Sequence, residues 1–170
     1  MNAHAVVRQD GDGERLWFAG GGVFTIKVSA EETGGVFSLW EDCVGRGKTT
    51  PLHAHPNLDE TIYMLEGELL VEIDGEQHRV GPNGVFVAPR GVPHAFLVTS
   101  DTARLLCLQT PGAGDSFYRD ASDPVTSTSD ATRPADFSRL REAAERSDSI
   151  QLLGPPPFTA EQAEPRSGSA

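Results

Sequence analysis

Three histidines and one glutamate form the most chemically suggestive pattern in the sequence. His53 and His55 are two residues apart, Glu60 follows five residues later, and His94 comes directly after a turn rich in proline and glycine. In an extended strand, residues two apart face the same way, so His53 and His55 can present two imidazoles to one point. Pro56-Asn57 then interrupts the strand and allows Glu60 to return beside the histidines on the next one.

Three neutral imidazoles and one carboxylate are a donor set for a borderline divalent ion. Nitrogen and oxygen donors of this kind suit iron, nickel, manganese, cobalt, copper or zinc, and the residue types do not choose among them. Sites of this kind keep one or two positions open, which distinguishes catalytic from structural metal sites. We therefore expect one divalent transition metal ion, with Glu60 acting as a ligand, as a general base beside the metal, or as both in turn.

Short strands must position these residues. Runs rich in Val, Leu, Ile and Phe alternate with Gly, Asp or Pro, the pattern of an all-β sandwich or barrel. Asp74-Gly75 separates two such runs as a tight hairpin, because glycine tolerates positive φ. Nine strands, which suit a closed barrel, are predicted at 15–18, 22–29, 36–43, 60–65, 68–73, 77–80, 85–88, 94–99 and 104–109.

The chain divides into an N-terminal tail at 1–14, a barrel at 15–122 and a C-terminal part at 123–170 that contains a linker, a short helix and a flexible tail. A length of 170 residues suits a single domain with one hydrophobic core. We therefore look for one site.

The C-terminal part is expected to hold little regular structure. Residues 123–135 are dominated by Ser, Thr, Asp and Pro and read as the linker. Asp136 can cap a helix that runs to about Arg146. The apolar segment 150–158 contains three prolines and is expected to dock in extended form on a surface or a neighbouring subunit. The last dozen residues are predicted to be disordered.

Charge and composition exclude several classes of partner. The chain has 14 Lys and Arg against 25 Asp and Glu, a net charge of -11, which repels nucleic acid and anionic membranes in the absence of a basic patch. It contains no run of about 18 apolar residues that would span a membrane, and the apolar run of a signal peptide is missing, so we expect a cytoplasmic protein. Cys43 and Cys107 are the only cysteines and are interpreted as buried small residues rather than disulfide partners or zinc ligands.

The spacing Gly-x5-His-x-His-x4-Glu-x6-Gly is met in full from Gly47 to Gly67 and resembles the first motif of the cupin family. Pro89, Gly91 and His94 match the core of the second cupin motif. Three other positions of that motif differ, because Asn83, Gly84 and Val98 stand where Gly, Asp and Asn are usual.

The resemblance extends over about residues 22–118. It implies a cupin double-stranded β-helix, or jelly-roll barrel, here followed by the short C-terminal helix and an extended tail. It also implies that His53, His55, Glu60 and His94 are the metal ligands. For His53, His55 and His94 one alternative remains, namely a cupin barrel that keeps these residues but uses no metal.

Three function hypotheses remain. The four-residue spacing between the second His and the Glu resembles that of single-domain quercetinases, which implies a dioxygenase in which the metal holds a deprotonated substrate hydroxyl and Glu60 is the general base. Cupin polyketide cyclases imply a non-redox cyclase or isomerase, in which the metal polarises a carbonyl and a base removes an α-proton. A non-catalytic cupin that binds a small molecule or stabilises a partner enzyme is the third.

Further residues near the motifs are either candidates for substrate contact or solvated side chains. Ile62, Met64 and Phe96 share faces with Glu60 and His94 and are candidates for contact with a small-molecule substrate, although core packing is the commoner role of such residues. The side chains of His4, His78 and Asp59 are expected to be solvated and to have no site role. Arg46, Lys48 and Arg90 lie near the motif turns and could meet an anionic substrate, although solvated charge is the commoner role of such residues. Extended segments that flank a barrel fit a homodimer.

Overall fold

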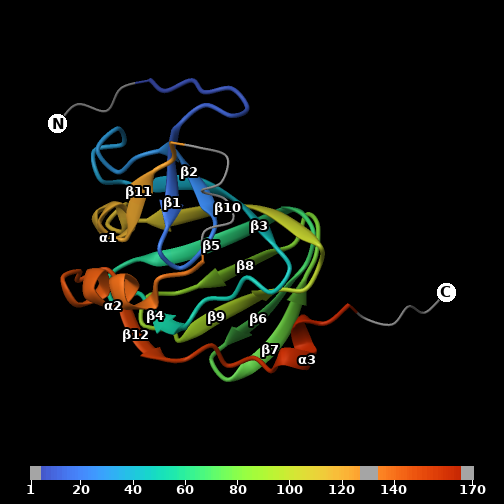
Figure 1. Ribbon diagram of the computed structural model, residues 1–170. Helices are drawn as coiled ribbons and strands as arrows, with labels where there is room; N and C mark the ends of the chain where they lie inside the picture. Colours follow the sequence, from blue (N-terminus) through green and yellow to red (C-terminus); the bar gives the residue numbers. More distant parts are fainter. Residues whose placement is uncertain (1–4, 127–133, 166–170) are drawn as a thin grey trace.

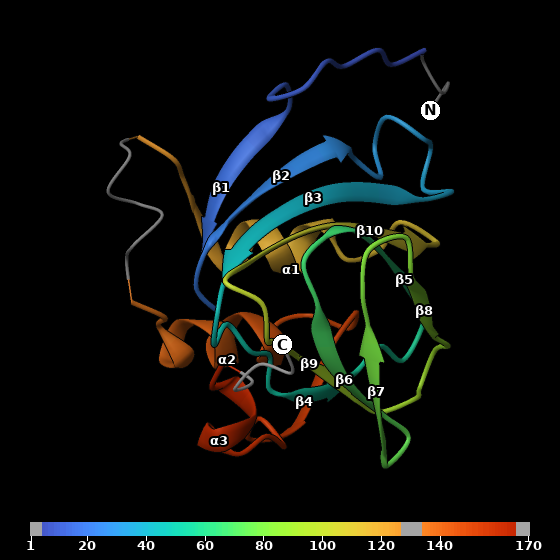
Figure 2. The ribbon, with the colours of Figure 1, turned by 90° about the vertical axis from the view of Figure 1, so that its right-hand side faces the viewer.

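The computed structural model, which describes residues 5–126 and 134–165, consists of two antiparallel sheets that face each other (Figures 1 and 2). The first sheet has the order β11 (Ser122–Pro124), β1 (Glu14–Phe18), β2 (Val23–Val28), β3 (Ser38–Gly45), β10 (Thr102–Thr110), β5 (Asp59–Glu66), β8 (Val85–Ala88). The second has the order β12 (Gln151–Gly154), β4 (Leu52–Ala54), β9 (His94–Val98), β6 (Leu69–Ile73), β7 (Glu76–Val80). The predicted all-β jelly-roll barrel is confirmed.

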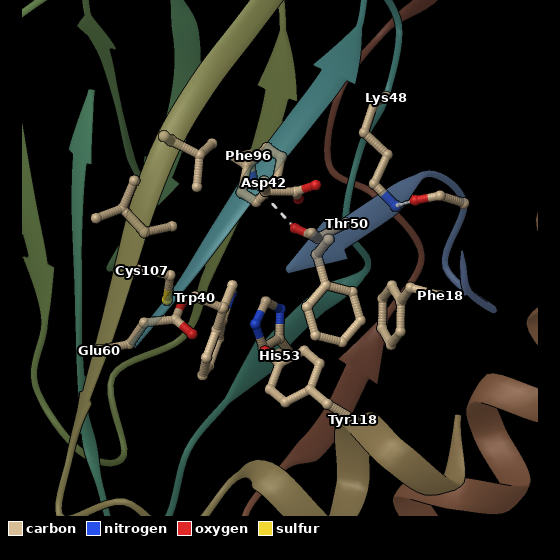
Figure 3. A pocket seen from close by; sticks show the side chains of 14 residues that line it. Phe18, Trp40, Asp42, Lys48, Thr50, His53, Glu60, Phe96, Cys107 and Tyr118 are labelled. Atoms are coloured by element: carbon tan, nitrogen blue, oxygen red, sulfur yellow. Dashed lines mark hydrogen bonds between the residues drawn. The ribbon is translucent and has the colours of Figure 1, made fainter. Parts of the chain in front are cut away.

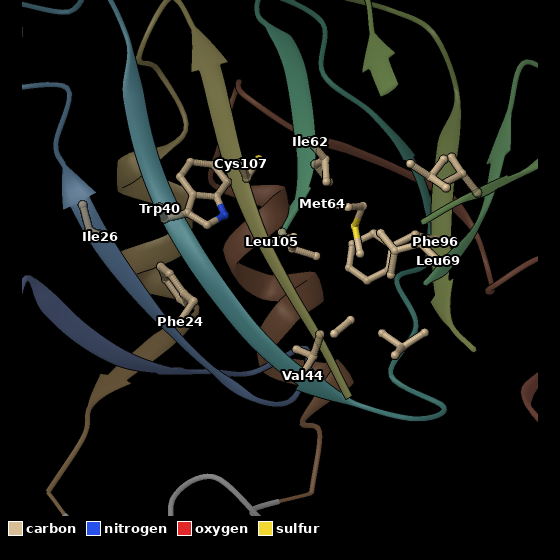
Figure 4. Packing of buried hydrophobic residues seen from close by; sticks show 14 of the residues in the cluster. Phe24, Ile26, Trp40, Val44, Ile62, Met64, Leu69, Phe96, Leu105 and Cys107 are labelled. Carbon is tan, nitrogen blue, oxygen red and sulfur yellow. The ribbon is translucent and has the colours of Figure 1, made fainter. Parts of the chain in front are cut away.

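The main hydrophobic core fills the space between the two sheets (Figure 4). Side chains alternate across each strand, so every second residue points into the barrel. Strand β10 shows this most clearly, because Ala103, Leu105, Cys107 and Gln109 are buried while their neighbours are partly exposed. The opposing sheet contributes core residues such as Val71 on β6. The barrel interior is thus built from inward-facing positions of both sheets.

A second, smaller core lies outside the barrel between strand β1 and the helices α1 (Asp115–Asp120) and α2 (Phe137–Glu145). Trp17 and Phe117 pack there against Leu140 and Ile150. Helix α2 begins as predicted. The Asp136 side chain accepts a hydrogen bond of 3.1 Å from the Arg139 amide, which satisfies one free N–H of the first turn.

The C-terminal part is more regular than the sequence indicated. Strand β11 occupies the first residues of the expected linker, and residues 127–133 of that linker lie outside the described residues. The segment that starts at residue 150 does dock in extended form, as strand β12 on this chain's own β4. The prediction of disorder for the last dozen residues is wrong for helix α3 (Ala160–Ala163), whereas residues 166–170 are not described.

Other expectations also need correction or remain open. Cys107 is buried as expected, but Cys43 is exposed. His4 lies outside the described residues, and the side chain of His78 is exposed on β7. None of the helices in the described part of the chain has the length and apolar character that crossing a membrane requires.

Candidate metal centre

The structure brings His53, His55, Glu60 and His94 together inside the barrel. Strand β4 carries His53, His55 follows it directly, Glu60 lies on β5, and His94 begins β9. His53 and His94 are direct partners in the β4–β9 pairing. One nitrogen or oxygen donor atom from each of the four residues lies within 4.8 Å of the others, and all four residues are buried. Three strands from two sheets therefore converge on one point.

Backbone carbonyls fix the protonation of all three imidazoles. The Nδ1 atoms of His53, His55 and His94 lie 2.8, 2.7 and 3.0 Å from the carbonyl oxygens of Pro51, Ser149 and Val92. A carbonyl oxygen can only accept a hydrogen bond, so each Nδ1 must carry the proton. In a neutral imidazole the lone pair is then on Nε2, which is the arrangement found in metal-binding histidines.

The Nε2 atoms face a carboxylate that also has only lone pairs to offer. Glu60 Oε2 lies 3.2 Å from His94 Nε2, and Glu60 Oε1 lies 3.4 Å from His55 Nε2. The buried His55 Nε2 has no hydrogen-bond partner in the described structure. With neutral imidazoles these acceptors point at one another, so a positive charge among them, from a metal ion or from a proton on an imidazole, stabilises the cluster. Burial disfavours the charged form of His55, but the Glu60 carboxylate outweighs burial and raises the pKa of His55.

The cluster fits a divalent transition metal ion in size as well as in donor chemistry. Metal–nitrogen and metal–oxygen bonds of about 2.1 Å put ligands on opposite sides of an ion about 4.2 Å apart. The 4.8 Å spread of the donor atoms therefore requires only a small contraction.

The ionisation of the cluster is suited to metal binding. Burial lowers the pKa of His53 to about 3, with a further contribution from the neighbouring His94 and His55. Burial by itself would raise the pKa of the Glu60 carboxyl, but His55 and His94 outweigh that effect and hold it well below its usual value. A neutral His53 and an ionised Glu60 are the forms that a metal ion binds.

Gln109 is a site residue that the sequence analysis missed. Its Nε2 donates a hydrogen bond of 2.9 Å to Glu60 Oε1 from the adjacent strand β10, and its side chain is fully buried. This contact fixes one carboxylate oxygen and leaves the other toward His94. The available signal was an amide at an inward position of an otherwise apolar strand.

The second motif keeps its turn despite the substitutions. Asn83 has a φ of 63°, in the left-handed region that a glycine enters freely and that asparagine tolerates better than most residues.

The last glycine of the first motif, Gly67, cannot be replaced by a larger residue without strain. Its φ is 79°, and a Cβ there would lie 2.2 Å from the Thr102 carbonyl oxygen.

His53 and Glu60 line a pocket inside the barrel whose walls are largely aromatic (Figure 3). Trp40 and Tyr118 stand beside the imidazole of His53 in this view, and Phe96 lies near Asp42. Of the three residues predicted to contact a substrate, Ile62 and Phe96 line the pocket, whereas Met64 is fully buried in the core and is not among its lining residues. Their contact with a substrate stays a prediction.

The charged residues near the motifs take different positions. Asp59 faces away from the site, as expected, and forms an ion pair of 2.8 Å with Arg90. Arg46 pairs with Asp101 on the surface. The expectation of a solvated Lys48 is wrong, because this side chain lines the pocket and donates to the Gly20 and Gly21 carbonyls.

The fold and the cluster define a class of protein: a jelly-roll barrel with a three-histidine, one-carboxylate cluster that opens on an internal pocket. Residues 40–109 match the Cupin domain family. The match covers 70 of the 170 residues, all of them within the jelly-roll barrel, and shows that this part of the chain is similar to the Cupin domain.

A search of curated proteins finds similarity to quercetin 2,3-dioxygenase from Bacillus subtilis. The two are 29% identical over 147 residues, which cover 85% of this chain and 43% of the relative. The chain thus spans less than half the length of this relative.

Two solved structures have a similar fold. An RmlC-like cupin from Shewanella frigidimarina has a TM-score of 0.58 at 19% identity, covering 68% of this chain and 98% of the other. The polyketide cyclase RemF from Streptomyces resistomycificus has a TM-score of 0.56 at 22% identity, covering 81% and 99%. At these identities the likeness concerns the fold alone.

Proposed function

We propose that this protein is a metal-dependent enzyme that acts on a small aromatic molecule, with dioxygenase chemistry. The observation that carries the proposal is that two members of the metal cluster, His53 and Glu60, face an internal pocket lined by aromatic side chains. A ligand in this pocket therefore reaches the cluster directly. The similarity to quercetin 2,3-dioxygenase supports an aromatic substrate and the use of dioxygen.

In this proposal the four residues hold one divalent transition metal ion that, when bound, supplies a Lewis-acid position for a substrate oxygen and for reaction with dioxygen. His53, His55 and His94 donate through Nε2, because each Nδ1–H is bonded to a carbonyl. Glu60 is in reach of a substrate hydroxyl in the pocket and can take its proton as general base. Gln109 keeps the Glu60 carboxylate in place for this transfer.

The pocket walls contribute by orienting the substrate and excluding water. Trp40, Phe96 and Tyr118 present aromatic surfaces between which a planar ring can stack. Exclusion of water strengthens the electrostatic effect of the Glu60 carboxylate on a bound hydroxyl.

The test is oxygen uptake with a flavonol such as quercetin. Protein reconstituted separately with iron, nickel, manganese, cobalt, copper or zinc is mixed with quercetin in an oxygen electrode. We expect uptake with at least one redox-active metal and a loss of at least a hundredfold in Glu60→Gln, with the exposed Glu66→Gln of the same strand as the matched control.

Three results would overturn parts of the proposal. Substrate conversion without dioxygen and with zinc would support a cyclase or isomerase instead. Tight ligand binding that is unchanged by a chelator, with no turnover, would support a non-catalytic binding protein. Full activity of metal-loaded Glu60→Gln would remove Glu60 as the base.

A further inference from the structure

A second carboxylate, that of Asp42, lines the same pocket as the metal cluster. Strand β3 alternates, and Asp42 is at an inward position between Trp40 and Val44, both of which are buried in the barrel core. On the neighbouring strands its direct partners are Phe24 and Leu105, which are also core residues. The carboxylate thus occupies a position that the pattern assigns to an apolar side chain.

The strand register places Asp42 at some distance from the metal cluster along the pocket. Gln109 on β10 is the pairing partner of Glu60 on β5. Asp42 on β3 is the pairing partner of Leu105, which lies four residues before Gln109 on β10. At about 3.3 Å per residue, the two levels are roughly 13 Å apart. The level between them holds the aromatic ring of Trp40.

Asp42 keeps acceptor capacity for a ligand. Its hydrogen bond within the protein is with the amide of the adjacent Cys43, and no cation of the described residues lies within 4.0 Å of it. Burial raises its pKa to about 6, against the opposing effect of the Lys48 charge. Asp42 is half-buried on the pocket wall, and a partly desolvated carboxylate without an ion-pair partner costs stability, so a binding role accounts for its presence there.

Lys48 helps to define what Asp42 can bind. Its ammonium group already donates to the Gly20 carbonyl and, at 2.6 Å, to the Gly21 carbonyl, and it lies 5.4 Å from the centroid of the Phe18 ring. Lys48 therefore holds the turn between β1 and β2 against the wall of the pocket. With Lys48 occupied, a carboxylate at this end of the pocket repels an anionic group and accepts a hydrogen bond from a neutral donor.

We infer that Asp42 is a specificity residue that accepts a hydrogen bond from a hydroxyl group at the far end of a planar aromatic ligand whose near end lies at the metal cluster. Figure 3 shows the two ends, with Asp42 and Lys48 on one side and His53 and Glu60 on the other. The ligand class is then a polyphenol with one metal-binding oxygen end and one hydroxylated end. This inference rests on the proposed function, because the near end must reach the cluster.

The test compares ligands that differ in one distal group. Protein loaded with zinc, a redox-inactive metal, is titrated without oxygen by calorimetry with 3-hydroxyflavone and with derivatives that carry a hydroxyl or a methoxy group at position 7 or 4′. We expect the wild-type protein to bind at least one hydroxyl derivative about tenfold more tightly than its methoxy partner, since a hydrogen bond to a charged acceptor is lost in the latter.

Substitution of Asp42 shows whether it is the acceptor. Asp42→Val keeps the approximate shape and should abolish the preference for a hydroxyl derivative over its methoxy partner. Asp10→Val, which removes a carboxylate that is 91% exposed outside the pocket, should keep the preference. A preference that persists in folded Asp42→Val would overturn the inference.

If Asp42→Val fails to fold, the ligand comparison with the wild-type protein alone still decides the question. Equal affinity for hydroxyl and methoxy derivatives would overturn the role of Asp42 and leave the proposed function intact. No binding of any of these flavonols to the zinc-loaded protein would overturn both.

Discussion

Two regions of the chain build the metal centre in different ways. Residues 40–109, which match the Cupin domain, carry all four donor residues. The segment 134–154, called here the C-terminal strap, carries none, yet its Ser149 carbonyl accepts the hydrogen bond from His55 Nδ1 and its strand β12 pairs with β4, which holds His53. The family-matched region thus supplies the ligands, and the strap orients one of them.

The difference has a physical basis. His53 and His94 bond to carbonyls two residues earlier in the chain, so these two rings are oriented by local backbone. His55 depends on a residue 94 positions away, so its ring is fixed only when the strap is docked. We therefore expect metal affinity to respond to packing outside the barrel as well as to the ligand residues themselves.

The largest expected effect comes from removal of a ligand. His55→Ala should abolish stoichiometric metal binding, because it removes an Nε2 donor and leaves the Glu60 carboxylate less well neutralised. Metal content by mass spectrometry after gel filtration checks this. His78→Ala, on the exposed face of β7, should retain wild-type content. One metal per chain in His55→Ala would break the assignment of the ligands.

A smaller effect is expected from release of the strap. Ile150 is 8% exposed and packs in the second core, next to Ser149, so Ile150→Asp places a charge among apolar side chains and should undock the strap. We expect a 10- to 100-fold loss of metal affinity, measured by competition with a chromophoric chelator.

The matched control for this change is Leu153→Asp, at an exposed position of β12. It should leave metal affinity within about twofold. Unchanged affinity in Ile150→Asp, with proteolysis confirming that the strap is released, would show that the strap has no part in the metal centre.

A moderate effect on stability is expected at Gln109. Gln109→Leu removes the donor to Glu60 Oε1 and leaves this buried carboxylate oxygen without that hydrogen bond, beside His55 Nε2 at 3.4 Å. Loss of a hydrogen bond to a charged group costs about 1.5–3 kcal/mol, which lowers Tm by roughly 3–12 °C for a chain of this size. Thermal melts of metal-free protein test this against exposed Gln151→Leu. Equal melting temperatures would contradict the role of Gln109.

The smallest effect is expected on the outer face of β5. Asp59 pairs with the Arg90 side chain and accepts from its amide, and these hydrogen bonds lower its pKa to about 2. Its contribution is present above the unfolded pKa near 3.8 and is lost as the pH falls toward 2. Asp59→Asn should therefore lower Tm by a few degrees at most at pH 7, a difference that vanishes near pH 2. A difference that grows at low pH would contradict this sign.

The sequence predicted the parts of the structure that depend on local pattern. The nine strands with clear alternation are present with small changes in their ends, and the Asp136 cap begins helix α2. Strand β11 was missed because three residues are too few to show alternation, and β4 was indicated only by the spacing of His53 and His55. Strand β12 was expected only as an extended segment, since its pairing with β4 is a tertiary contact.

The site residues also divide into those with a local sequence pattern and those that depend on tertiary contacts. The donor residues have a readable spacing, and the structure brings them to one point. Gln109 and Asp42 had a weaker signal, namely polar residues at inward positions of apolar strands. The Ser149 carbonyl had none, because any residue supplies the same backbone atom. The homodimer and the cytoplasmic location stay predictions.

The most direct test of the metal centre is the X-ray absorption spectrum of the protein loaded with its preferred metal. We expect three imidazole nitrogens and at least one oxygen at about 2.0–2.2 Å, with one imidazole lost in any preparation of His53→Ala or His94→Ala that retains metal. A sulfur ligand, or an ion surrounded mainly by water oxygens, would contradict it.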